Sequence, residues 1–236
     1  MTSDSLHIVI CGFPRSGSTL LYNMMLTSSN PENDLYFWGG EKRALSVVGK
    51  QWRQISKFPS DLFFIPTIQQ ECEEQGIEPR FVLTTRDPRG VLTSVHANSE
   101  GQYKVGWDYA LGTNVNGLTG GKTEGLLTYI QELKKYPDIL TIRYEDLISK
   151  PNEIQEIIGD YLNLSWNTNF NTFHKRIIPK GLHHQMNGVR ELDKSRIDGW
   201  RDHPERIKEQ FERCPALFDA LIDLGYEKDR EWIRNI

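Results

Sequence analysis

Short apolar runs alternate with amphipathic stretches along most of this chain. The segment 6–12 holds the continuous apolar run Ile8-Val9-Ile10-Cys11, and 81–85 begins with a second one, Phe81-Val82-Leu83. Between 17 and 27, leucine and methionine recur at the spacing of one helix face. With Pro as a helix start and Gly or Pro as a stop, the pattern predicts strands over 6–12, 34–38, 81–85 and 139–143, and helices over 17–27, 43–56, 66–75, 88–97, 105–118, 123–135, 151–162, 204–213 and 215–224. The run 61–65 fits a strand or a loop, and 163–195 favours long loops.

Strands that alternate with helices are typical of a parallel sheet with helices on both faces. No repeat, low-complexity segment or linker interrupts the chain, so residues 1–236 are expected to form one three-layer α/β/α domain. In such sheets ligands bind beyond the carboxyl ends of the strands. The segments 12–19 and 86–94, and Tyr144, each follow a predicted strand and are expected to converge at that edge.

The segment after the first predicted strand, Gly12-Phe13-Pro14-Arg15-Ser16-Gly17-Ser18-Thr19, carries the strongest signal of function. A strand, a glycine-containing loop and a helix in this order point backbone N–H groups at one place, which suits an anion. The spacing is that of the phosphate loop G-x-x-x-x-G-K-[ST], except that Ser18 takes the lysine position. Arg15 offers a positive charge instead, and the neighbouring hydroxyl groups are further donors. The alternative is an ordinary turn with polar capping residues.

Composition narrows the class of protein. With 38% hydrophobic and 25% charged residues the chain is globular, and a formal net charge of −4 argues against a protein that coats nucleic acid. The three cysteines have no paired spacing, which favours buried thiols in a reducing compartment. The first residues do not resemble a signal peptide, and no apolar run approaches the ~20 residues of a membrane span. The expectation is a cytoplasmic protein without a membrane or nucleic-acid partner.

A second motif begins where the strand 81–85 ends, with Arg86 and, eight residues later, Ser94. Alone, this pair fits a surface arginine and a solvated serine. Together, the two motifs resemble those of the sulfotransferases that use 3′-phosphoadenosine-5′-phosphosulfate (PAPS), with a P-loop-like fold, and are most similar to bacterial and tyrosylprotein-type members. The resemblance implies that Arg86 and Ser94 hold the 3′-phosphate. It also implies that the 5′-phosphosulfate is held by Arg15, Ser16, Gly17, Ser18 and Thr19.

Two further segments are similar to elements of this family. Arg143-Tyr144-Glu145-Asp146-Leu147 resembles its Y-E-D-L element, which implies that Tyr144 contacts the adenosine. The segment 195–201 resembles one that closes over the nucleotide, which implies contacts from Ser195, Arg196, Trp200 and Arg201. The donor would then be PAPS and the product adenosine 3′,5′-bisphosphate (PAP), with no metal. Arg15 would be the main electrostatic catalyst.

The acceptor must lose a proton to a base. The segment Gly39-Gly40-Glu41-Lys42-Arg43 is similar to G-E-E-T-R of tyrosylprotein sulfotransferases, which implies that Glu41 is that base. The alternative is a glutamate that interacts with a helix N-terminus. The histidine-bearing K-T-H-type segment of cytosolic members has no counterpart here. His183, His184 and Trp38 are candidates to line the acceptor pocket, although surface or core positions explain them as well, and the two histidines lack further ligands for a metal site.

The sequence therefore predicts a PAPS-dependent sulfotransferase that acts on a hydroxyl or amine of a small metabolite or natural product. One alternative is a P-loop small-molecule kinase that uses Mg-ATP, against which Ser18 speaks. The others are a nucleotide-binding module without activity and a sulfotransferase for protein tyrosine or glycans. The acceptor pocket is expected within 39–52, 101–123 and 170–189. Because dimers occur in the family, a homodimer is one expectation.

Overall fold

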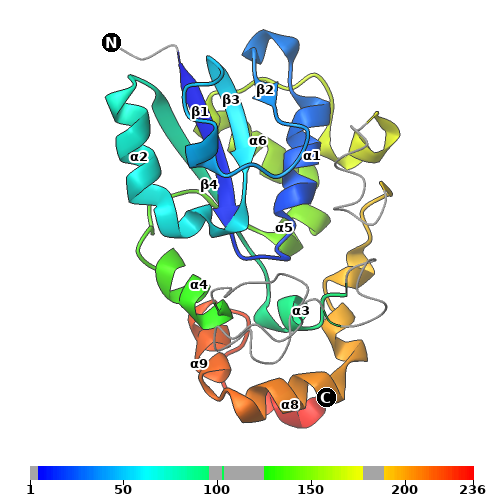
Figure 1. Ribbon diagram of the computed structural model, residues 1–236. Coiled ribbons are helices and arrows are strands. Elements are labelled where there is room, and N and C mark those ends of the chain that lie inside the picture. The colour runs from blue at the N-terminus through cyan, green and yellow to red at the C-terminus, as the bar shows by residue number, and fades with distance from the viewer. Residues whose placement is uncertain (1–4, 96–102, 104–124, 178–188) are drawn as a thin grey trace. The chain divides into compact units, whose positions relative to one another are not determined.

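The computed structural model describes residues 5–95, 103, 125–177 and 189–236 (Figure 1). Contacts within the chain divide it into two compact units. Unit 1 consists of Met1–Thr85 and Asp138–Asp193, and unit 2 of Arg86–Pro137 and Lys194–Ile236. The chain passes from one unit to the other after Thr85, Pro137 and Asp193.

Unit 1 is built on a five-stranded sheet in which all neighbouring strands are parallel. Its strands, in spatial order, are β2 (Tyr36–Phe37), β3 (Arg53–Lys57), β1 (Leu6–Gly12), β4 (Glu78–Thr85) and β5 (Thr141–Arg143). The central strand β1 is buried along its whole length, and Ile8 pairs with Ile55 on one side and Arg80 on the other. Burial on both faces explains the continuous apolar run of this strand.

Helical elements cover both faces of the sheet. Leu6, Ile8 and Ile10 of β1 join one buried apolar cluster with side chains of the elements on the first face. These elements are α1 (Ser18–Ser28), α5 (Tyr144–Ser149), α6 (Pro151–Leu162) and η6 (Phe170–Lys175). The second face carries η3 (Pro59–Phe64) and α2 (Ile65–Glu74). Figure 1 shows α2 on one side of the sheet and α1 and α6 on the other, which confirms the three-layer α/β fold.

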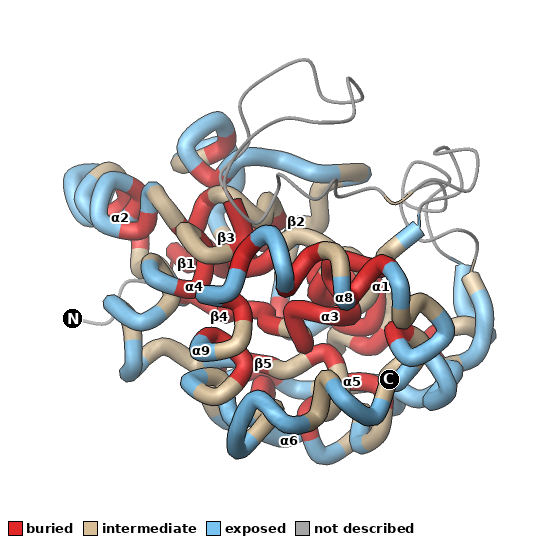
Figure 2. The backbone as a smooth tube through the Cα atoms, turned by 90° about the horizontal axis from the view of Figure 1, so that it is seen from below, coloured by how far each residue is buried: buried red, intermediate tan, exposed pale blue. Residues whose placement is uncertain are grey.

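Unit 2 is helical in the part of it that the structure describes. Its elements are α3 (Pro88–Leu92), α4 (Leu126–Leu133), η8 (Lys194–Arg196), η9 (Gly199–Asp202), α8 (Pro204–Arg213), α9 (Ala216–Asp223) and η10 (Glu231–Asn235). Its core is aromatic: Phe211 lies edge-on to Phe218 and Trp232, with ring centroids 4.9 and 5.1 Å apart. Trp200 lies edge-on to Trp232 at 5.9 Å. Figure 2 shows α3 as buried chain.

The helix predicted over 43–56 is wrong. This segment contains the short η2 (Ala44–Ser46), a left-handed Gly49 with φ +72°, and strand β3. The apolar residues have helical spacing, but Trp52 is 62% exposed while Ile55 is buried inside the sheet. Gly49 ends any helix here, and β3 lacks an apolar pattern because its other residues are polar.

Other elements differ in length from their predictions. Helix α3 ends at Leu92 rather than near 97, where the Thr93 hydroxyl donates to the Arg89 carbonyl at 2.8 Å. The run 61–65 is helical: residues 61–64 lie in η3, and Ile65 begins α2. The helices predicted over 151–162 and 204–213 have the predicted bounds. The helix predicted over 105–118 lies outside the described residues.

Two observations bear on the chain as a whole. Cys11, Cys72 and Cys214 are free thiols, and all three are buried. Among the helices that the structure describes, none has the length and apolar character needed to cross a membrane.

Candidate functional site

The loop between β1 and α1 crosses the end of β4. Gly12 has φ +128°, and a Cβ atom there would lie 2.2 Å from the Thr84 carbonyl oxygen. The Phe13 N–H donates to that same oxygen at 2.8 Å. Position 12 therefore requires glycine, both for its backbone conformation and for this close approach.

The start of α1 is defined by Gly17 and Tyr144. Gly17 is left-handed, with φ +83°, and directly precedes the first helical residue, Ser18. A Cβ atom at Gly17 would lie 2.7 Å from Cδ2 of the Tyr144 ring, so the ring lies against the loop backbone. Tyr144 is buried. Its predicted adenosine contact stays a prediction, and the contact that the structure has is with the loop.

Ser16 and Arg15 differ in what they offer a ligand. The Ser16 hydroxyl is 1% exposed and bonds the Phe13 carbonyl at 2.5 Å and the Thr84 hydroxyl at 2.7 Å, so it braces the loop against β4. Arg15 has φ +63°, a left-handed conformation that is rare for a residue with a side chain. Backbone strain of this kind gathers at functional sites, which is consistent with the predicted role of Arg15.

Lys57 is a site residue that the sequence reasoning missed. It ends β3, is 1% exposed, and donates from Nζ to the Thr19 hydroxyl at 2.8 Å and to Oε1 of Glu41. An ammonium group thus reaches the first turn of α1 from a neighbouring strand, although Ser18 occupies the lysine position of the loop. The available signal was a lysine just before Phe58-Pro59, but the wrongly predicted helix over 43–56 hid the strand that presents it.

Opposing influences act on the pKa of Lys57. Burial lowers the pKa of Lys57 below its usual value. The Glu41 carboxylate and its hydrogen bond act in the opposite direction, and the positive charge of Arg15 adds to the lowering of this pKa. Arg15, Lys57 and Glu41 therefore form one electrostatic cluster around the loop.

Glu41 lies in a segment without regular secondary structure that precedes η2, and not at the start of an α-helix. Two backbone N–H groups fix this segment: that of Lys42 donates to the Lys57 carbonyl at 3.2 Å, and that of Ala44 donates to Oδ2 of Asp61 at 2.8 Å. The Glu41 side chain is 39% exposed, so it is reachable from solvent. Asp61 is 2% exposed, and burial raises its pKa to about 6.

The loop and Lys57 flank a natural ligand position of the sheet. After β1 the chain turns to α1 on one face, and after β3 it turns to η3 and α2 on the other. Adjacent parallel strands whose connections leave in opposite directions open a crevice at their carboxyl ends, where ligands of such folds bind. Gly12 and Lys57 are the carboxyl-terminal residues of these two strands. The cluster around the loop is therefore the candidate site of unit 1.

In unit 2, Arg86 and Arg196 are brought together. A Cβ atom at Gly90 would lie 2.7 Å from Nε of Arg86, so the side chain folds along α3. Its Nη2 donates to the Arg196 carbonyl at 3.4 Å. Ser94 lies two residues past the end of α3, not within it, and its N–H donates to the Val91 carbonyl at 3.1 Å. Arg86 and Ser94 thus stand at opposite ends of this short helix.

Trp200 is a core residue of unit 2. It is 3% exposed, and the guanidinium groups of Arg89 and Arg201 lie over its ring at 3.9 and 4.4 Å. Arg201 also pairs with Asp198 at 3.6 Å. Packing thus accounts for Trp200, and its predicted nucleotide contact, like that of Ser195 in η8, stays a prediction.

The predicted acceptor residues are only partly described. The Trp38 carbonyl accepts a hydrogen bond from the Tyr22 hydroxyl at 2.7 Å, and its ring lies edge-on to Tyr36 at 4.9 Å. His183 and His184 lie outside the described residues.

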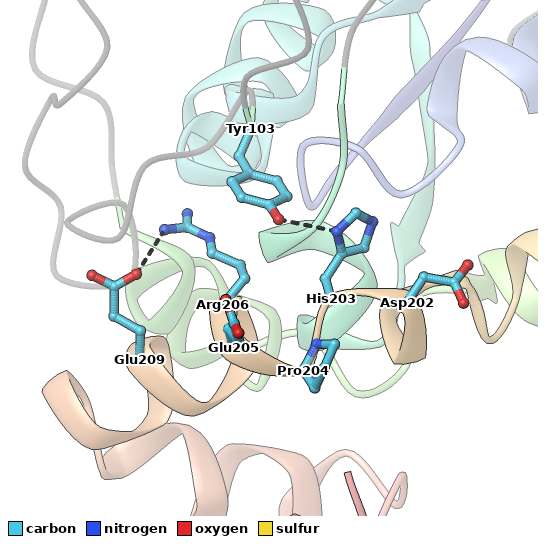
Figure 3. Close-up of a pocket in the computed structure, with 7 residues that line it drawn as sticks. All are labelled: Tyr103, Asp202, His203, Pro204, Glu205, Arg206 and Glu209. Carbon is cyan, nitrogen blue, oxygen red and sulfur yellow. Dashed lines mark hydrogen bonds and ion pairs between the residues drawn. The ribbon is translucent and has the colours of Figure 1, made fainter.

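Unit 2 also holds a cavity of about 640 Å³ at the start of α8 (Figure 3). The Tyr103 hydroxyl lies 3.0 Å from Nδ1 of His203, and the Arg206 guanidinium lies 4.7 Å from the centre of the Tyr103 ring. The described residues that line this cavity are Tyr103, Asp202, His203, Pro204, Glu205, Arg206 and Glu209. Three carboxylates suit a phosphate poorly. Tyr103 belongs to the segment 101–123, which was predicted to help build the acceptor pocket.

Comparisons with known proteins bear on the fold. No family model matches the sequence, and no curated protein sequence does. Among solved structures, the sulfotransferase domain from the curacin biosynthetic pathway is similar with a TM-score of 0.56 and 17% identity, over 94% of this chain and 98% of that one. The sulfotransferase domain from the Synechococcus PCC 7002 olefin synthase has a TM-score of 0.53 and 16% identity, over 84% and 87%. Mouse sulfotransferase SULT7A1 complexed with PAP has a TM-score of 0.53 and 11% identity, over 94% and 86%. The chain therefore has the sulfotransferase fold.

Proposed function

We propose that this protein is a sulfotransferase that moves a sulfonate group from PAPS to a hydroxyl or amine of a small-molecule acceptor and releases PAP. One observation carries the proposal: the Lys57 ammonium bonds both Glu41 and Thr19, which lies on the first turn of the helix that follows the anion loop. A carboxylate reachable from solvent thus stands beside a buried cation at a phosphate-type loop. The sulfotransferase fold of the chain supports this reading.

Sulfonate transfer requires the site to stabilise charge on the departing phosphate and to take a proton from the acceptor. As the acceptor oxygen or nitrogen attacks the sulfur, the bond from sulfur to the bridging oxygen breaks, and its electron pair stays on the departing phosphate. Arg15, Lys57 and the N–H groups at the start of α1 stabilise that charge. The acceptor proton passes to the Glu41 carboxylate, which Lys57 orients by its hydrogen bond.

The position of Lys57 also bears on the kinase alternative. In ordinary P-loop enzymes the lysine stands within the loop and reaches the β- and γ-phosphates of a nucleoside triphosphate. Here Ser18 occupies that position, and the ammonium comes from β3 to Thr19. This supports a donor whose transferring group is a single sulfonate on the 5′-phosphate.

Arg86, with its side chain along α3, and Ser94 are the proposed ligands of the 3′-phosphate, and Arg196 lies beside Arg86. A guanidinium is suited to a phosphate because it donates two parallel hydrogen bonds.

The acceptor is proposed to be a small metabolite or natural product. Two of the similar structures are named for the curacin biosynthetic pathway and an olefin synthase, which supports this class over protein tyrosine or glycans. Three free thiols are also consistent with a cytoplasmic location.

Thermal unfolding with two nucleotides tests the donor. PAP without metal is expected to raise the Tm, because a ligand that binds only the folded state stabilises it by mass action. A response to Mg-ATP alone would instead identify a kinase and overturn the proposal. Turnover of labelled PAPS with a panel of hydroxyl and amine acceptors then separates an enzyme from a binding module.

Two variants test the assigned roles. Glu41→Gln is expected to keep PAP binding and lose about 10²- to 10⁴-fold in turnover, the range of general-base catalysis. Arg86→Ala is expected to weaken PAP binding. Glu74→Gln, on an exposed face of α2, and Arg80→Ala, which loses the exposed pair with Glu78, are the matched controls. Unchanged turnover in Glu41→Gln would remove Glu41 as the base.

A further inference from the structure

We propose that Arg89 is a positioning residue that orients Arg86 and thereby makes the site selective for nucleotides with a 3′-phosphate. This inference rests on the proposed function, since it deepens the role of the Arg86 site. It concerns unit 2 alone.

Arg89 is locked to the start of α3. It is 3% exposed, and its Nε lies 3.0 and 3.1 Å from the two carboxylate oxygens of Asp87, with Nη2 2.7 Å from Oδ2. Oδ1 of Asp87 also accepts the backbone N–H of Arg89 at 2.8 Å, which caps the helix. Because Asp87 follows Arg86 directly, this bidentate ion pair fixes the backbone that carries Arg86.

The far side of Arg89 is anchored in the C-terminal part of unit 2. Its Nη1 donates to Oε1 of Glu227 at 2.5 Å. Its guanidinium lies in the corner formed by two nearly perpendicular indole rings, 3.9 Å from the centre of Trp200 and 4.5 Å from that of Trp232. Burial works against this charge, but the hydrogen bonds and charges of Asp87 and Glu227 outweigh it and hold the pKa of Arg89 above its usual value. Two carboxylates and two aromatic rings thus hold the charged guanidinium in place.

The link to Arg86 is steric. Arg86 lies along α3 in the space that the missing side chain of Gly90 leaves, one residue after Arg89. On the other side its Nη2 meets the Arg196 carbonyl, three residues before η9, the element that carries Trp200. The two segments that flank the Arg86 side chain are therefore both held by Arg89. Helix α3 is held through Asp87, and the segment 196–200 is held through the Trp200 ring. A change at Arg89 shifts the guanidinium of Arg86 without touching a ligand.

A pair of nucleotides separates this role from a merely structural one. PAP and adenosine 5′-phosphate share the base, the ribose and the 5′-phosphate, and differ in the 3′-phosphate. The first variant, Arg89→Lys, keeps the charge but loses the bidentate pair with Asp87 and the planar group that lies over the indole rings. The second, Glu227→Gln, weakens the contact with Nη1 and leaves Arg89 in place. Arg230→Lys is the matched control, because Arg230 also lies over an aromatic ring, Phe218, and pairs with a carboxylate, Asp219.

Calorimetric titration of the full chain with each nucleotide is the measurement. Wild type is expected to prefer PAP by about tenfold or more, since a 3′-phosphate adds charge-assisted hydrogen bonds. In Arg89→Lys and Glu227→Gln this preference is expected to fall about fivefold or more, with the affinity for adenosine 5′-phosphate within about twofold of wild type. Arg230→Lys is expected to keep the wild-type preference.

Each other outcome overturns a defined statement. If Glu227→Gln keeps the wild-type preference, or if both nucleotides weaken equally in the two variants, Arg89 is not a positioning residue, while the proposed function stands. If wild type binds neither nucleotide, the proposed function fails, and this inference fails with it. Because Glu227 is partly exposed, Glu227→Gln remains informative if Arg89→Lys does not fold.

Discussion

The ammonium of Lys57 donates a hydrogen bond to the hydroxyl of Thr19 across 2.8 Å, so that β3 and the first turn of α1 meet at one buried cation. The same ammonium holds Glu41. A single side chain therefore connects the loop, the sheet and the candidate base, and its removal is the sharpest test of the site.

Lys57→Met removes the charge and keeps most of the side-chain volume. Turnover is expected to fall by about 10²- to 10³-fold, the loss seen when one donor to a developing charge is removed. The affinity for PAP is expected to fall as well, because PAP carries the 5′-phosphate on which this charge develops. Thermal unfolding is expected to show an equal or higher Tm, because an apolar side chain often replaces a buried ion at no cost and Glu41 can be hydrated. Lys50→Met is the control on an exposed lysine; equal turnover in the two variants would exclude Lys57 from the chemistry.

Lys57→Arg tests the same residue through pH. Because burial lowers the pKa of Lys57, wild type is expected to lose this charge, and with it turnover, at a pH below the usual range of lysine. Arginine stays protonated, so the alkaline limb of the pH–turnover profile is expected to move to higher pH in Lys57→Arg. Coincident limbs in the two proteins would show that another group sets this limb.

Gly17→Ala is expected to destabilise the loop for two separate reasons. The φ of +83° disfavours any side chain, and the new Cβ would lie 2.7 Å from the Tyr144 ring. The free energy of unfolding should fall by about 1–3 kcal/mol. The variant Tyr144→Ala removes the clash but not the backbone strain. Gly17→Ala is therefore expected to lower the free energy of unfolding less when it is added to Tyr144→Ala than when it is made in wild type. Gly39→Ala, with no atom within 4 Å of its new Cβ, is the control in chemical denaturation.

His7 is expected to weaken the fold in mild acid. It is buried, with Nε2 2.9 Å from the Ser56 hydroxyl, and burial lowers its pKa from 6.5 to about 4. The unfolded chain therefore takes up the proton first, and the contribution of His7 is complete above pH 6.5 and decreases as pH falls towards 4. The full loss is about 3 kcal/mol. Urea denaturation of His7→Gln at several pH values is expected to lack this loss; a wild-type-like loss in the variant would assign it elsewhere.

Asp61 is expected to act in the opposite direction. Its pKa is raised from 3.8 to about 6, so its contribution is complete below pH 3.8 and is lost as pH rises through 6. Asp61→Asn is expected to raise the free energy of unfolding at pH 7 by up to about 3 kcal/mol, provided that the amide oxygen still accepts the Ala44 N–H. Between pH 4 and 6 the two slopes oppose each other in wild type. Each single variant should therefore reveal the slope of the remaining group, and a variant curve parallel to wild type would contradict this.

The parts of the fold that were predictable are those whose signals are local. The apolar run of β1, the glycines of the loop and the proline that opens α6 each determine structure within a few residues. The loop was identifiable because its spacing encodes a backbone shape. The parallel sheet followed from the alternation of strands and helices.

Strand β3 could not be predicted, because its buried polar side chains depend on partners that lie outside the strand. Gln54 donates to the Val47 carbonyl at 2.8 Å, Ser56 bonds His7 at 2.9 Å, and Lys57 bonds Thr19 and Glu41. Each polar group is buried only because such a partner exists. Without β3 the sequence placed Lys57 outside any element, and the candidate site lacked its central cation. The contact between Tyr144 and Gly17 was hidden as well, since it joins residues from the two separate segments of unit 1.

The three buried thiols can report whether the two units of the chain open together or separately. Cys11 and Cys72 belong to unit 1, and Cys214 belongs to unit 2. Since a buried thiol reacts with an alkylating reagent only when its surroundings open, the labelling rate of each cysteine reports the opening of its own unit. One common rate corresponds to a chain that opens as a whole, whereas a faster Cys214 corresponds to a helical unit that opens while the sheet stays intact. Mass spectrometry after a short pulse of reagent distinguishes the two without any mutation.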